Sequence, residues 1–427
     1  MLSIILLILS APALFVPVFS GYVLGLLMIV LAISLWSSKE FQKVGSNGKA
    51  FIKALMPVSR AAAVFWLCLA FSACAAGTLS GSIDQNALIR SLGNFFVKYV
   101  LLWFVYLSFW WRVGASDQNS RIFSTAYALS AVVNAAYCLI QRQIGVDWAH
   151  GFGHFLGENR FAYGVYRVSG FMGHPLTLGY CQVLALVASI HFFMVSISRQ
   201  EKIAWLASAL SAAFVLLISG SRGPQLTALV GGLLIVPIRL WKLRWREVGV
   251  MSLLLLILAA KIGVFERYSE LLSRGFGGDM RSIHWAVHWQ VFKDNFWFGM
   301  GPGGPKSAIS AYYFAYQADD NIRLAHNTFL QCGADFGIVG LGGMFLWLRS
   351  WSKIEIRSKA TKQAISVVIA VTVLAGLTQN VLQDSGFVLG VTTWIMIITS
   401  FEVSRRDKLV STTQNSNHFS REGDAAT

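Results

Sequence analysis

The sequence predicts an all-α, polytopic membrane protein with about twelve transmembrane helices and two long loops on one face. Three observations carry this prediction: the composition, the length of the apolar runs and the distribution of basic residues. Hydrophobic residues make up 55% of the 427-residue chain, charged residues only 13%, and the mean hydropathy is +0.58. A soluble domain carries roughly 25% charged residues. The composition therefore excludes an ordinary soluble domain.

A helix needs about 20 predominantly apolar residues, or a few less, to cross a hydrocarbon core of about 30 Å. Twelve runs meet this requirement: 3–18, 20–36, 59–78, 92–111, 122–140, 175–197, 203–219, 224–240, 247–264, 328–348, 364–380 and 387–402. The first run has no basic region before it and no compelling cleavage site, which favours a retained helix over a signal peptide. Because a membrane barrel would show alternating segments of about 10 residues instead, the runs are expected to be helices.

The basic residues predict how these helices are oriented. In a twelve-helix arrangement, 22 of the 35 lysines and arginines lie on one face and 13 on the other. The positive-inside rule places the richer face, and with it both termini, in the cytoplasm. The net charge of +15 then reports orientation and does not indicate a nucleic-acid partner. We expect one integral membrane domain over residues 1–404 and a disordered cytoplasmic tail over residues 405–427.

Two long loops, near residues 141–174 and 261–327, lie on the opposite face. Long connections of this kind are usually functional or disordered. Both loops are rich in Trp, Phe, Tyr, Gly and His, which suits a surface at the level of the lipid headgroups or a groove that holds sugars by stacking. In the second loop, the glycines at 299, 301, 303 and 304 predict a flexible turn.

No metal site is expected from the sequence. The five cysteines lie in or near apolar runs and lack the paired spacing of a disulfide or zinc framework. Two histidine pairs, His150 with His154 and His284 with His288, have the i,i+4 spacing that can place two imidazoles on one helical face. Zinc would also need a third ligand and an orienting partner, and an HExxH motif is absent. The sequence assigns these four histidines no role.

Arg222 is the first candidate site residue. It lies in the segment Ser219-Gly220-Ser221-Arg222-Gly223, between two apolar runs and on the same face as the long loops. An ionisable group at the edge of the bilayer is costly, which favours a functional role. The alternative is a snorkelling arginine that anchors a helix end.

His326 is the second candidate, on the same face and at the beginning of an apolar helix. The positive end of the helix dipole disfavours a charged imidazolium, and a neutral imidazole can accept a proton. The alternative is a residue that only anchors the helix at the membrane interface. Arg167, in the first long loop, could add positive charge to the same region or pair with nearby acidic residues.

Together these segments resemble the O-antigen ligase and polymerase superfamily of bacterial cell envelopes. The resemblance rests on SGSRG at a helix end, Arg281 in the second long loop, and His326-Asn327 followed by Gly337 and Gly340. The segment Arg167-Val168-Ser169-Gly170 is also similar to the family's preceding loop, so the resemblance covers roughly residues 160–345. Each short motif is weak alone, but their order, sidedness and spacing agree with the family.

The resemblance implies transfer of a glycan from undecaprenyl diphosphate to an acceptor hydroxyl at the periplasmic face of the inner membrane, with inversion at the anomeric carbon and no metal or other cofactor. In this family the arginines matching Arg222 and Arg281 hold the lipid diphosphate, and the histidine matching His326 is the base. The residue types fit these roles, because guanidinium groups bind phosphate oxygens in pairs and a neutral imidazole can remove a hydroxyl proton.

Three functions compete. The first is a ligase that joins a lipid-linked O-antigen to lipid A-core in lipopolysaccharide biosynthesis. The second is a polymerase that extends the lipid-linked glycan and differs in its acceptor alone. The spacing from His326-Asn327 to the following glycines favours the ligase. The third is a polysaccharide or lipid transporter, which should show repeat symmetry and broken helices that meet at the midplane.

Overall fold

The structure is a computed structural model. It describes residues 46–80, 85–96, 117–145, 161–162, 165–172, 174–196, 198–235, 281–302, 306–316 and 324–402, except 383, 385, 386, 389 and 401. The helices expected over 3–18, 20–36 and 247–264, the pair His150 and His154, and the tail over 405–427 lie outside the described residues.

The described part of the chain is almost entirely helical, in agreement with the predicted all-α class. Its helices are α4 (Ser46–Ser80), α5 (Gln85–Phe96), α7 (Asp117–Ile144), α8 (Pro175–Val195), α9 (Arg199–Ile218), α10 (Arg222–Ile235), α13 (Arg281–Asp294), α14 (Lys306–Ala315), α15 (Thr328–Trp351), α16 (Lys359–Thr378) and a last helix, Gly390–Ser400. The exceptions are a 3-10 turn, η5 (Gly170–Met172), and a hairpin of β1 (Phe161–Ala162) and β2 (Val165–Tyr166).

Five described helices are long and apolar enough to cross a membrane. They are Phe51–Thr78 within α4, α8, α9, α15 and α16. All five coincide with spans expected from the sequence, and Gly390–Ser400 is a shorter apolar helix where another was expected. The total of twelve spans and the sidedness of the loops stay predictions.

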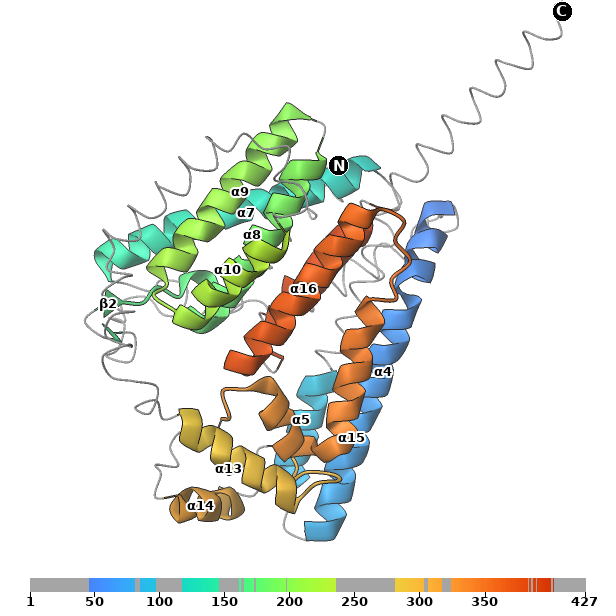
Figure 1. Ribbon diagram of the computed structural model, residues 1–427, viewed down its shortest axis with the longest axis vertical. Helices are drawn as coiled ribbons and strands as arrows, with labels where there is room; N and C mark the ends of the chain where they lie inside the picture. The colour runs from blue at the N-terminus through green and yellow to red at the C-terminus, as the bar shows by residue number, and fades with distance from the viewer. Residues whose placement is uncertain are drawn as a thin grey trace, which may run out of the picture.

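Helix α16 lies between two groups of helices, α7 to α10 on one side and the pair α4 and α15 on the other (Figure 1). Aromatic stacking fills the first group, where the rings of Phe192 and Trp205 lie 4.6 Å apart. A hydrogen bond of 2.8 Å from Ser189 to Ser208 joins α8 to α9, as small polar residues often do between membrane helices. These contacts fix the helices whose ends form the candidate site.

Glu402, which follows the last helix, binds the backbone just before α16. Its buried carboxylate accepts hydrogen bonds from the backbone N–H groups of Arg357 and Ser358, each at 3.0 Å. A negative charge is stabilising at this position because the helix dipole is positive there. The contact fastens the last helix to the end of α16 that lies away from the candidate site.

Helix α15 is two helical segments that meet at Gly337, where φ is 62° and ψ is −162°. The break frees backbone groups on both sides, and residues 296–300 satisfy them. The N–H of Met300 donates to the carbonyl of Ala334 and the N–H of Ile338 donates to that of Phe296, both at 2.8 Å. The expected helix over 328–348 is therefore present but interrupted.

Two glycines make this close approach possible. A Cβ atom on Gly337 would lie 2.4 Å from the carbonyl carbon of Trp297, and one on Gly299 would lie 2.4 Å from that of Asp335. Gly299 and Gly301 also have positive φ angles of 68° and 88°, and the N–H of Gly301 donates to Asp335. The expected turn is present at Gly299 and Gly301, and hydrogen bonds to the backbone of α15 hold it in place.

The second long loop contains the helices α13 and α14, which the sequence analysis did not predict. One face of α13 is buried and carries His284 and His288, whereas the opposite face exposes Trp285 and Trp289 at 38% and 50%. In Figure 1, α13 and α14 lie below the lower end of α16, at the level of the lower part of α4. Exposed tryptophans on a short helix in this position are typical of the lipid headgroup level.

We predict that Gly337→Ala destabilises the protein by at least about 2 kcal/mol, because alanine is strained at this positive φ and its Cβ would collide with the backbone of Trp297. Thermal unfolding of the detergent-solubilised protein measures the effect. Gly342→Ala, in the same helix with nothing within 4 Å of the added Cβ, is the matched control and should be neutral or slightly stabilising. Equal melting temperatures for the two variants would contradict the tight contact between Gly337 and the backbone of Trp297.

Candidate functional site

The SGSRG segment is a tight turn that reverses the chain from α9 into α10. Gly220 has a φ of 60°, which favours glycine, and the N–H of Ser219 closes the last turn of α9 by donating to Val215 at 2.8 Å. The side chain of Gln225 reaches back and donates to the carbonyl of Leu216 at 3.1 Å. The turn therefore places Arg222 as the first residue of α10.

The backbone just after Arg222 packs tightly against α8. A Cβ atom on Gly223 would lie only 2.5 Å from the hydroxyl of Tyr180, so no larger residue fits here without displacing the tyrosine. That hydroxyl is hydrogen-bonded to the side chain of Thr378, the last residue of α16. Arg222 is half-buried, and the Nε and Nη2 atoms of its guanidinium are buried. Tyr180 thus contacts both the start of α10 and the end of α16.

His326 lies immediately before the cap of α15 in a strained conformation. Its φ of 47° makes it the one described non-glycine residue with positive φ, at a cost of about 1–3 kcal/mol. Hydrogen bonds on both sides hold it there. The N–H of Ala325 donates to the side chain of Gln331 at 2.9 Å, and Asn327 caps α15 by accepting from Phe329 at 2.9 Å. The surrounding structure therefore imposes the position of the histidine.

The imidazole of His326 contacts two other helices. Its Nδ1 atom lies 2.9 Å from Oε1 of Gln379, the residue that caps the end of α16. Thr328 donates to the backbone carbonyl of the same glutamine at 3.0 Å. Helix α13 contributes His284, whose ring centroid is 5.9 Å from that of His326.

Arg281 is the first residue of α13, three positions before His284. Its positive charge is close enough to act on the phenol of Tyr180, which links α13 to the contact beside Arg222. His284 is itself oriented, since its Nδ1 atom lies 2.9 Å from the hydroxyl of the buried Tyr313 on α14. Helix α13 therefore contacts His326 through His284 and lies near Tyr180 through Arg281.

Arg167 reaches the SGSRG turn from the first long loop. Its Nη2 atom donates to the Oγ atom of Ser221 at 2.8 Å. The loop is fixed on α7 by Gln141, whose Oε1 atom accepts from the N–H groups of Ser169 and Gly170 at 3.0 and 2.9 Å. The position of Arg167 is thus set by α7, although the two are distant in the sequence.

The structure brings the four residues predicted from the sequence, Arg167, Arg222, Arg281 and His326, to one end of the helix bundle. The first turns of α8, α10 and α15 also lie at this end, and helix N-termini favour anions. Sequence reasoning did not identify the residues that connect the four: Tyr180, Thr378, Gln379, Gln141 and Ser221. They belong to common residue types in helices and turns, and only their contacts identify them.

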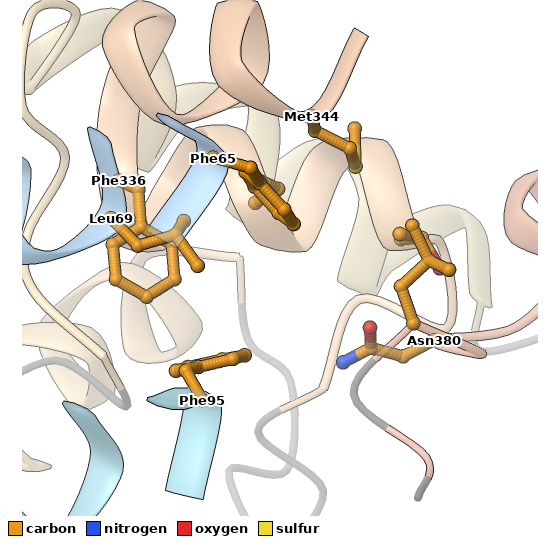
Figure 2. Close-up of a pocket in the computed structure, with 9 residues that line it drawn as sticks. Phe65, Leu69, Phe95, Phe336, Met344 and Asn380 are labelled. Carbon is orange, nitrogen blue, oxygen red and sulfur yellow. The ribbon is translucent and has the colours of Figure 1, made fainter. Parts of the chain in front are cut away.

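A small pocket lies beside this region, between α4, α5 and α15 (Figure 2). Most of its lining is apolar and includes Phe65, Leu69, Phe95 and Phe336. Its polar lining residues are Thr328 and Asn380. The side chains provide no positive charge for a phosphate. The pocket therefore belongs to the apolar packing behind the start of α15 and not to an anion site.

The histidine pair His284 and His288 shows no arrangement for a metal. Each Nδ1 atom already has a neighbour: Tyr313 for His284, and the carbonyl of His284, at 2.8 Å, for His288. Within the described ranges, no three His, Cys, Asp or Glu side chains cluster as a metal site would require. The pair instead packs α13 against α14.

Comparison with known protein families finds a match over part of the chain. Residues 206–345 match the family described as O-antigen ligase, which confirms the resemblance seen in the short motifs. The matched segment contains Arg222, Arg281 and His326, whereas Arg167 precedes it and Gln379 follows it. No curated protein matches the chain. This match covers about a third of the chain, and together with the membrane-spanning helices it supports a membrane enzyme of the O-antigen ligase and polymerase type, with activity of the glycosyltransferase kind.

Proposed function

We propose that the protein is a metal-independent, inverting glycosyltransferase that moves a glycan from undecaprenyl diphosphate to an acceptor hydroxyl at the periplasmic face of the inner membrane. The favoured acceptor is lipid A-core, which makes the protein an O-antigen ligase. One observation carries the proposal: His326 and three arginines meet at one end of the helix bundle, although they come from four separate segments.

The sidedness of the site supports the periplasmic assignment. The connection between α15 and α16 lies at the opposite end of α16 and contains Lys353 and Arg357, with Arg349 and Lys359 beside it. Positive residues concentrate on the cytoplasmic side of a membrane, so the site faces the periplasm. The cytoplasmic termini, the membrane domain over 1–404 and the tail over 405–427 are parts of the same proposal.

Arg222 and Arg281 are proposed to bind the diphosphate, with Arg167 adding positive charge. The diphosphate gains negative charge as the bond to the sugar breaks, and guanidinium groups can neutralise it with two parallel hydrogen bonds each. The lipid tail keeps the diphosphate at the membrane surface. Arg222 begins α10 at that level, where the helix dipole adds to the positive field.

His326 is proposed to be the general base. The acceptor oxygen attacks the anomeric carbon from the side opposite the diphosphate, the new bond forms as the bond to phosphate breaks, and the configuration inverts. The hydroxyl proton passes to the imidazole, and the lipid diphosphate leaves with the bonding electrons. A positioned base of this kind contributes about 10²–10⁴-fold to the rate.

The transporter alternative would use broken helices to bind its cargo at the midplane. Helix α15 is broken at Gly337, but residues 296–300 satisfy the freed backbone groups. The break therefore fastens the second long loop to the bundle, which favours a fixed catalytic site over a transport path.

We predict that His326→Asn lowers glycan transfer by about 10²–10⁴-fold, because asparagine tolerates the positive φ but cannot act as the base. Transfer by the purified protein in proteoliposomes, from a lipid-linked glycan to lipid A-core, measures the effect. Thermal unfolding should be close to that of the unchanged protein. Substantial transfer by a folded His326→Asn variant would remove His326 as the base.

Arg222→Lys should lower transfer by about ten- to a hundredfold, because lysine keeps the charge but lacks the planar fork that binds a diphosphate in two places. The same assay measures it. Arg199→Lys is the matched control, since Arg199 begins α9, whose other end leads into the SGSRG turn. If both lysine variants keep full activity, Arg222 is a helix anchor.

The glycan phenotype of a deletion strain separates the ligase from the polymerase. Loss of the ligase should leave long glycan chains on the lipid carrier and none on lipid A-core, because polymerisation continues without transfer. Gel analysis of lipopolysaccharide and of lipid-linked glycans measures both pools. Single repeat units attached to core would identify a polymerase instead.

A further inference from the structure

We infer that Gln379 is a positioning residue for the proposed base: its side-chain carbonyl holds His326 in the tautomer and orientation that leave Nε2 free to accept a proton. The inference rests on the proposed function, since it assigns a partner to the same histidine. Gln379 lies outside the segment matched to the family, 53 residues after His326.

The tautomer follows from the hydrogen bond. A neutral imidazole has one nitrogen that donates and one that accepts, and the hydrogen bond made by one nitrogen decides the role of the other. Nδ1 of His326 lies 2.9 Å from Oε1 of Gln379, and an amide oxygen can only accept. Nδ1 therefore carries the hydrogen, and the lone pair of the ring is on Nε2.

Gln379 is well suited to hold the ring still because its own backbone is fixed. Its N–H donates to Ala375 at 2.9 Å, and its carbonyl accepts from Thr328 at 3.0 Å and from the N–H of Val381 at 3.0 Å. Thr328 lies two residues after His326, so the side chain of Gln379 contacts the imidazole and its backbone binds the chain that follows the histidine. A fixed partner also helps to maintain the strained φ of His326.

The amide of Gln379 differs from a carboxylate in its effect on the charge of His326. A carboxylate would stabilise the imidazolium and keep the base protonated to higher pH, whereas the neutral amide orients the ring without that effect. Ionisable groups on the elements around His326 include Arg281, His284 and His288 on α13, Arg222 on α10, Tyr180 on α8, Asp335 on α15 and Asp384 after α16. Substitutions at Gln379 leave all of these in place.

Two variants of Gln379 test the inference in the proteoliposome transfer assay, measured from pH 5 to pH 9 with His326→Asn as the reference for loss of the base. Gln379→Leu removes the acceptor at similar volume and should lower kcat at least about tenfold, within the contribution of a general base. Gln379→Glu restores an acceptor, so it should recover most of the activity at high pH, with the acidic limb of the profile moved to higher pH.

Gln363→Leu is the matched control, a glutamine at the other end of α16 whose side chain donates to Leu234 at 3.0 Å, and it should leave the profile unchanged. Wild-type kcat in Gln379→Leu, or reduced activity in Gln379→Glu without a shifted limb, would overturn the inference while His326→Asn remains inactive. An active His326→Asn variant would overturn the proposed function itself, and the role of Gln379 with it.

Discussion

The end of α16 is the point on which the geometry of the site depends. Within two residues, Thr378 binds Tyr180 of α8 and Gln379 binds both Thr328 and the ring of His326. Gly223 packs against the same tyrosine hydroxyl, so the start of α10 is fixed relative to α16 as well. One helix end thus sets the positions of a proposed phosphate ligand and of the proposed base.

The second constraint is the break in α15. In a membrane an unsatisfied backbone group costs several kcal/mol, so a helix can be interrupted only where protein replaces the lost hydrogen bonds. Residues 296–300 do so at Gly337, and α13 directly precedes this segment. The break therefore holds α13, with Arg281 and His284, next to the helix that His326 precedes. A site built from such fixed elements keeps its groups within the small tolerances that catalysis needs.

The candidate residues could be selected from the sequence because charge is rare in this chain. Arg222 and His326 were identified by their positions at helix ends, and the structure does place each at the beginning of a helix. Their connections were not predictable. Gln379 is an ordinary amide at the end of an apolar run, and only the fold brings it to His326. The break at Gly337 was hidden as well, because the apolar run continues through it.

Helices α13 and α14 were missed for a different reason. Residues 281–294 mix apolar residues with histidines and charged residues, so they do not form the continuous apolar stretch by which a membrane helix is found. The i,i+4 spacing of His284 and His288 was a helical signal, and it reflects packing against Tyr313 and the backbone. A helix at the membrane interface has two different faces, and its average composition resembles that of a loop.

Helix α13, with one buried and one exposed face, also suggests where the acceptor of a ligase or a polymerase would be selected. In the proposed mechanism the arginines bind the diphosphate and His326 acts on one hydroxyl, which both reactions share, so these residues would not select the acceptor. Selection requires contacts with the rest of the acceptor molecule. A lipid-anchored acceptor approaches along the membrane boundary, where α13 exposes Trp285 and Trp289 while its buried face places His284 beside His326. The same helix therefore joins the proposed reaction centre to the surface along which the acceptor arrives.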